Sequence, residues 1–171
     1  MKGKNGNKGS EIQQYWKILV ESTRDLLNQM SLVDITDCIY KKDDMPINKD
    51  VVAGLISLVG DINCSIFFAL PQKTAENMAL NFAGFEIPFD SADMGDAVGE
   101  FSNILAGRAK MRLTEQDIQV KLSLPNVLRA NDMTFLSGDE VAAMQSYFNC
   151  EHGDFWLGIH LKKSNRKTNV K

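Results

Sequence analysis

Three polar residues near the middle of the chain, Asp96, Glu100 and Asn103, are separated by four and then three positions. On a helix with 3.6 residues per turn, this spacing places their side chains on one stripe. Neither an acid nor an amide is a strong nucleophile in such a setting. An amide, however, donates and accepts hydrogen bonds at once, and it can therefore hold a water molecule in a fixed orientation. The stripe is thus a candidate site for aligning reactants.

Small residues surround this stripe. Gly95, Gly99 and Gly107 fall inside the same predicted helix, where an interior glycine costs about 1 kcal/mol relative to alanine. That cost indicates that another group approaches the helix backbone closely. The opposite face consists of apolar residues that would pack on a core, namely Met94, Ala97, Val98, Phe101 and Leu105. On spacing alone, a plainer interpretation is favoured: a solvated helix face whose glycines serve helix packing.

The elements that must position this helix follow from hydrophobic periodicity and turn signals. The expected helices cover residues 10–30, 71–82 and 92–113, the last with Ser91 as its N-cap. The expected strands cover residues 34–41, 51–59, 62–70, 118–124, 141–150 and 154–161. Two strand pairs flank short turns and read as antiparallel hairpins. The sequence therefore predicts a single-domain α+β fold, with a mainly antiparallel sheet packed against long helices.

Charge is unevenly distributed along the 171 residues, whose net charge is −3. We expect a disordered basic tail at residues 1–9 and a basic C-terminal tail at residues 162–171, because these ends hold eight basic residues and no acid. The predicted folded part, residues 10–161, retains 11 basic and 22 acidic residues. This acidic balance argues against nucleic acid as a partner. A hydrophobic content of 44% suffices for one core.

The sequence gives little support for a disulfide, a metal site, a catalytic triad or a membrane-spanning segment. Cys38, Cys64 and Cys150 lie far apart, so we expect buried reduced thiols in a cytoplasmic protein rather than a disulfide or zinc site. The two histidines, His152 and His160, lack the partners of a metal site or a catalytic triad. No apolar run approaches the roughly 20 residues that span a bilayer, and no signal peptide is evident. We expect no membrane partner, and no metal or cofactor of the chain's own.

The stripe and a later proline resemble the signature of the CheX/CheC/FliY phosphatases of bacterial chemotaxis. That family carries an Asp or Ser, then a Glu, an Asn and a more distant Pro. The corresponding residues here are Asp96, Glu100, Asn103 and Pro125. The interval from Asn103 to Pro125 is one residue shorter than the usual family spacing.

The surrounding sequence extends this resemblance. Residues 52–60 resemble the strand near the middle of these domains, and residues 103–110 resemble the continuation of the active helix. We judge the resemblance to cover residues 10–161 and to imply a CheC-like fold. The first helix holds only a faint echo of the motif, Asp25 and Asn28, without the glycines or a matching proline. A single active helix is closest to the CheX branch.

The resemblance implies a phosphatase that accelerates hydrolysis of the aspartyl phosphate on a CheY-like response regulator, whose own pocket supplies Mg²⁺ and a lysine. It implies that Asn103 inserts there and orients the attacking water, while Glu100 pairs with the lysine. The remaining partner-binding residues are Asp96 beside the pair, Gly99 and Gly107 where the partner's loops approach, and Pro125, which stiffens the neighbouring loop.

Two other functions remain open at this point. A non-catalytic adaptor would use the same helix to bind a response regulator or a flagellar-switch component. A small-molecule sensor would need a pocket between helices and sheet, for which the apolar segments offer no convergent polar set. By resemblance to CheX proteins we also expect a homodimer, with strands 141–150 or 154–161 as candidate edges for pairing with a second copy.

Overall fold

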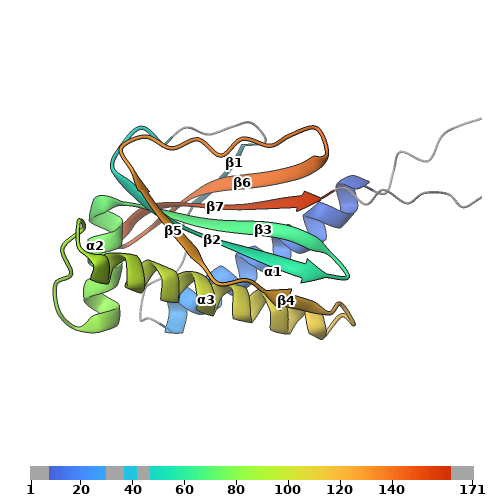
Figure 1. Ribbon diagram of the computed structural model, residues 1–171, viewed down its shortest axis with the longest axis horizontal. Coiled ribbons are helices and arrows are strands. Elements are labelled where there is room, and N and C mark those ends of the chain that lie inside the picture. Colours follow the sequence, from blue (N-terminus) through green and yellow to red (C-terminus); the bar gives the residue numbers. More distant parts are fainter. Residues whose placement is uncertain (1–7, 30–36, 42–46, 163–171) are drawn as a thin grey trace, which may run out of the picture.

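The computed structural model describes residues 8–29, 37–41 and 47–162, which form one antiparallel sheet with three helices (Figure 1). The helices are α1 (Lys8–Gln29), α2 (Gln72–Ala83) and α3 (Ala92–Thr114). The strands are β1 (Asp37–Lys41), β2 (Val51–Gly60), β3 (Asn63–Pro71), β4 (Val120–Leu122), β5 (Asn126–Ala130), β6 (Val141–Cys150) and β7 (Gly153–Lys162). Their order is β1-β6-β7-β3-β2-β4, and β5 also pairs with β2. The predicted α+β class is confirmed.

The two faces of the sheet carry separate apolar clusters. Along β3, the even-numbered residues from Cys64 to Leu70 join the main core with the three helices. The odd-numbered Phe67 and Ala69 belong to a smaller cluster on the opposite face, as the alternation of a strand requires. The segment between β5 and β6 covers that cluster, and Phe135 stacks on Phe67 with 3.6 Å between ring centroids. Figure 1 shows this segment and the helices on opposite sides of the sheet.

A glycine in β2 sets how closely α3 lies against the sheet. A Cβ atom at Gly54 would lie 1.9 Å from Ser102 Oγ and 3.0 Å from Ser102 Cβ, so a side chain there does not fit. Ser102 is itself buried and donates a 2.8 Å hydrogen bond to the Val98 carbonyl. The missing side chain in β2 therefore admits one turn of α3 close to the strand.

The chain after α3 differs from the sequence prediction. The expected strand over residues 118–124 is only the three-residue β4, and the following strand, β5, was not predicted. Strand β5 pairs with β2 from Val51 to Leu55. Its residues are exposed or half-buried, so β5 lacks the buried alternation by which a strand is recognised from sequence.

The expectation of free edges at residues 141–150 and 154–161 is wrong. Strand β6 lies between β1 and β7, and β7 lies between β6 and β3, so both strands already have a neighbour on each side. Helix α1 begins at Lys8 and β7 ends at Lys162. The rest of the two predicted basic tails lies outside the described residues.

Candidate functional site

The predicted polar stripe lies on α3, whose start is fixed by its N-cap. Ser91 Oγ accepts a 3.2 Å hydrogen bond from the Met94 amide, as expected for an N-capping serine, and donates to the Pro88 carbonyl. All five residues predicted for the core face of this helix are buried. The buried face is therefore the one the sequence predicted, and the stripe lies opposite it.

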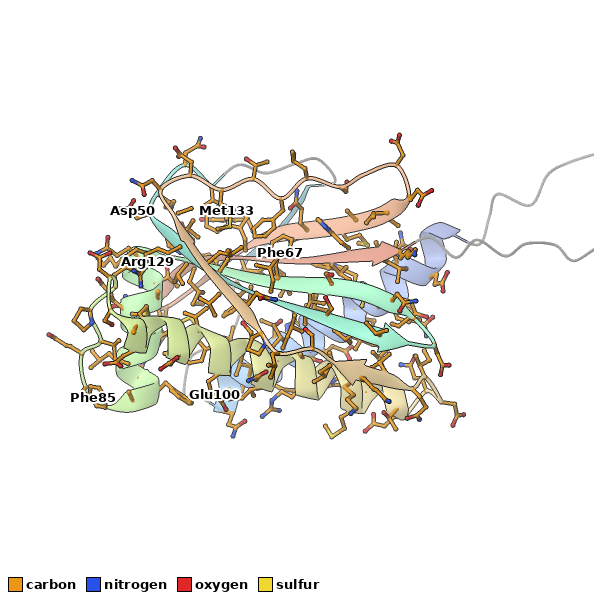
Figure 2. All side chains as sticks on the ribbon, viewed as in Figure 1. Asp50, Phe67, Phe85, Glu100, Arg129 and Met133 are labelled. Atoms are coloured by element: carbon orange, nitrogen blue, oxygen red, sulfur yellow. The ribbon has the colours of Figure 1, made fainter. Side chains whose placement is uncertain are left out.

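The side chains of Asp96, Glu100 and Asn103 are exposed. Within the described part of the chain, none of the three makes a side-chain hydrogen bond or an ion pair. Figure 2 shows Glu100 on the lower side of the molecule, away from Phe67 and Met133 on the opposite face of the sheet. The two acids and the amide of the stripe are thus available to another molecule, and no internal contact has to break before they bind.

Pro125 lies directly beside this helix, despite the shortened interval that separates it from the motif. A Cβ atom at Gly99 would be 3.8 Å from Pro125 Cγ and 3.6 Å from Val127 Cγ2. Gly99 is consequently buried beneath the chain's own loop and β5. The expectation that Gly99 admits a partner's loop does not fit this geometry. Gly107 does remain exposed, and a Cβ atom there would meet nothing within 4 Å.

The loop that carries Pro125 is tied to β2 by one serine. Ser123 Oγ accepts a 3.0 Å hydrogen bond from the Ser57 amide and donates a 2.8 Å bond to the Leu124 carbonyl. The Ser123 amide in turn donates to the Ser57 carbonyl at 2.9 Å. These bonds bridge the break between β4 and β5, and they hold the proline at a fixed place along α3.

A second tie joins β5 to the start of α3. The Arg129 guanidinium donates to the Asp90 carbonyl at 3.0 Å and to the Ser91 carbonyl at 2.8 Å, and it lies over the Phe89 ring. Neither Ser123 nor Arg129 was predicted from the sequence as part of the site. The only available signal was the Ser-Leu-Pro run itself, because the partners of both residues lie far away in the chain.

The other long helix braces α3 from its far side. Arg112 donates to Asp25 at 2.5 Å and to Glu21 at 3.3 Å, and Arg108 donates to Gln29. The hydrogen bond to Asp25 raises the pKa of the Arg112 guanidinium above its usual value. Since Asp25 is occupied in this way, the faint motif echo on α1 has no free acid to offer a partner.

Cysteines and histidines lie away from the stripe. Burial raises the pKa of the Cys64 thiol to about 12, and burial also raises the pKa of Cys150. Both are free, buried thiols, whereas the Cys38 side chain lies outside the described residues. His152 hydrogen-bonds Asn81, and the His160 ring packs edge-on against Phe67. Among the described residues, no group of three potential metal-binding side chains occurs, and no helix there is long and apolar enough to span a membrane.

Comparison with solved structures defines the class of fold. A CheC-like superfamily protein from Shewanella sp. PV-4 has a TM-score of 0.75 at 20% identity, over 86% of this chain and 97% of that one. The chemotaxis protein CheX of Desulfovibrio desulfuricans gives 0.74 at 24% identity, over 87% and 99%. CheX of Borrelia burgdorferi, in a complex with CheY, BeF3 and Mg²⁺, gives 0.65 at 18% identity, over 87% and 98%. The protein therefore has a CheC-like fold.

Sequence comparison then places the chain within this class. Residues 52–149 match the family model of the chemotaxis phosphatase CheX, and this span covers more than half of the chain. The chain belongs to the CheX family. The matched span begins in β2 and includes all of α3 and the loop with Pro125. No curated protein matches the sequence.

Proposed function

We propose that the protein accelerates hydrolysis of the aspartyl phosphate on a CheY-like response regulator, and that α3 brings Asn103 to the phosphoryl group. The observation that carries this proposal is the Glu100–Asn103 pair, which is exposed and without side-chain partners in the described part of the chain. Family membership supports phosphatase activity, and the Borrelia complex of CheX with CheY supports the kind of partner.

The chemistry needs little from this chain. The oxygen of a water molecule attacks phosphorus, the bond to the aspartyl oxygen breaks, and inorganic phosphate and a free carboxylate result. The Mg²⁺ ion and lysine of the regulator neutralise the charge on the phosphoryl oxygens. Asn103 aligns the water, because its carbonyl oxygen accepts a hydrogen bond from the water while its N–H group donates to a neighbouring oxygen. Such alignment can lower a barrier by several kcal/mol.

Glu100 has a different part in this proposal. It precedes Asn103 by three residues, so the two side chains are about 4.5 Å apart along the helix axis. Its negative charge pairs with the lysine of the regulator and fixes the position of α3 in the pocket. Asp96, one turn earlier, extends the acidic surface, and Pro125 keeps the adjacent loop against α3 during docking.

The test compares phosphate release from phosphorylated response regulators of the source organism, with and without the protein. We expect wild type to accelerate release from at least one regulator. Asn103→Ala should lower that acceleration by at least about 100-fold while leaving much of the binding intact. Asn28→Ala is the matched control, because Asn28 is also an exposed helical asparagine that follows an acid by three residues.

The outcomes separate the proposal from its nearest rival. Full activity of Asn103→Ala would contradict the assignment of this residue. Binding of a phosphorylated regulator without any faster release by wild type would instead identify an adaptor that uses the same helix. Glu100→Lys should weaken binding itself, because it places like charges together.

We also propose that the protein forms a homodimer, as the resemblance implies. In the described part of the chain, the two ends of the sheet are β1 and the side formed by β4 and β5. Pairing along β4 and β5 would bring the second copy to the loop that carries Pro125, so β1 is the edge compatible with the proposed activity. Light scattering at several protein concentrations tests the oligomeric state. The cytoplasmic location expected from the sequence stays a prediction.

A further inference from the structure

Large apolar side chains are exposed on both flanks of the α3 stripe. Leu124 is 85% exposed and directly precedes Pro125. Phe85 is 62% exposed and Phe82 is 45% exposed, and both lie at the end of α2. Single exposed apolar residues are ordinary, but groups of them around a polar site mark interaction surfaces. Whether these side chains form an interaction surface therefore depends on where they lie and on how firmly the backbone holds them.

Leu124 lies in the loop beside α3 that the Ser123 hydrogen bonds hold to β2. The segment after α3 runs back along this helix, since the Ile118 amide bonds the Leu113 carbonyl and the Arg129 side chain bonds the Ser91 carbonyl. Its neighbour Pro125 lies beside Gly99, so Leu124 lies on the side of Gly99 toward Asn103. The Ser123 hydrogen bonds fix the backbone of Ser123 against Ser57 and also hold the carbonyl of Leu124.

On the second flank, the end of α2 packs against α3. The Phe82 ring packs edge-on against Phe101, with centroids 5.2 Å apart, and Phe101 directly follows Glu100 in α3. Gly84 ends α2 with a left-handed backbone at φ 78°, which turns the chain and leaves Phe85 in solvent. Figure 2 shows Phe85 and Glu100 on the same lower side of the molecule.

We infer that Leu124 and Phe85 contact the response regulator on opposite sides of its phosphorylated pocket, so that the regulator straddles α3. This inference rests on the proposed function, because it assigns the occupant of the surface next to Glu100 and Asn103. Exposed charge pairs contribute little affinity and weaken in salt, whereas apolar contacts on a rigid backbone lose little entropy on binding. The two apolar flanks supply affinity, and the stripe supplies orientation.

Charge favours the regulator over a second copy of this chain as the occupant. Residues 86–100 contain five acids, Glu86, Asp90, Asp93, Asp96 and Glu100, and no basic residue. Two copies meeting through this surface would bring those acids together, and like charges across an interface oppose association. The lysine of the regulator's pocket offers Glu100 an opposite charge, which residues 86–100 of a second copy lack.

The experiment measures the dissociation constant of a beryllofluoride-activated regulator, chosen as one that wild type dephosphorylates. Leu124→Ser and Phe85→Ser should each raise the dissociation constant about tenfold, as expected for exposed apolar residues that become buried on binding. Leu136→Ser is the matched control, because Leu136 is 70% exposed on the segment that crosses the opposite face of the sheet. It should leave the dissociation constant within about twofold of wild type.

Steady-state kinetics keep this inference distinct from the proposed function. Leu124→Ser and Phe85→Ser should raise KM and leave kcat near wild type, since Glu100 and Asn103 are intact. Wild-type affinity of either variant would overturn the inference, even if Asn103→Ala is inactive as proposed. Equal weakening by Leu136→Ser would overturn it as well. A change of oligomeric state without a change in affinity would identify a second copy as the occupant, and would also contradict the inference.

Discussion

Gly54→Ala tests whether the close contact between β2 and α3 positions the site. The added Cβ atom would lie 1.9 Å from Ser102 Oγ, 3.0 Å from Ser102 Cβ and 3.3 Å from the Val98 carbonyl oxygen. Rotation of the serine hydroxyl relieves the first contact and breaks its bond to Val98, but the other two contacts remain. The helix must therefore move away from the strand.

The expected cost follows from the general behaviour of overfilled cores. Inserting a methyl group into a packed interior typically costs about 1–3 kcal/mol. We expect the free energy of unfolding to fall by about 2 kcal/mol, and the melting temperature to fall by about 4–8 °C for a domain of this size. Asn103 follows Ser102 directly, so a shift of a few tenths of an ångström at this turn should also lower the phosphatase rate, by less than the roughly 100-fold that a 1 Å misplacement can cost.

A double variant provides the control. Ser102→Gly removes both atoms that the new methyl group of Gly54→Ala would meet most closely, at a cost of roughly 0.5–1 kcal/mol for a glycine in a helix. The loss in free energy of unfolding for the double variant Gly54→Ala/Ser102→Gly should therefore be smaller than the sum of the two single-variant losses, by at least about 1 kcal/mol. Urea unfolding followed by circular dichroism measures all four proteins, with an unchanged m-value as the sign that the folded state is retained.

Two results would refute this reasoning. Gly54→Ala with a stability within about 0.5 kcal/mol of wild type would show that α3 does not depend on the close contact. Additive effects in the four-protein comparison would show that Ser102 is not the residue that meets the added methyl group.

Two further predictions concern stability. Gly107→Ala adds a methyl group in open space on α3, so the free energy of unfolding should rise by up to about 1 kcal/mol in urea melts, and a fall would contradict the open site. Burial raises the pKa of Cys64 from 9.0 to about 12, so its contribution to stability is fully present below pH 9 and is lost as pH rises from 9 toward 12. Cys64→Ala should flatten the decline between about pH 9 and 10, whereas an unchanged slope would exclude this thiol as its source.

Local pattern was sufficient for the elements that carry the stripe. The spacing of polar and apolar residues along 92–113 identified the exposed and buried faces of α3, and Ser91 identified its start. Both hairpins followed from alternating apolar residues around short turns. These features depend on residues only a few positions apart, so the periodicity of the sequence is enough to predict them.

Contacts between distant segments were not recoverable in this way. Strand β5 was missed because an edge strand with exposed side chains has no buried alternation, and Gly99 was assigned to a partner because nothing local reveals that Val127 covers it. The interior places of β6 and β7 depend on β1 and β3, which lie far away in the chain.

The sequence by itself shows that one helix carries an acid and an amide on its outer face, because helical periodicity is a local property. Which residues lie beside that face depends on the fold as a whole. The absent side chain at Gly54 admits α3 to the sheet, the Ser123 bonds bring Pro125 beside it, and Leu124 becomes exposed next to the stripe. Each of these contacts joins residues that are distant in the chain, and only the packing of the whole sheet brings them together.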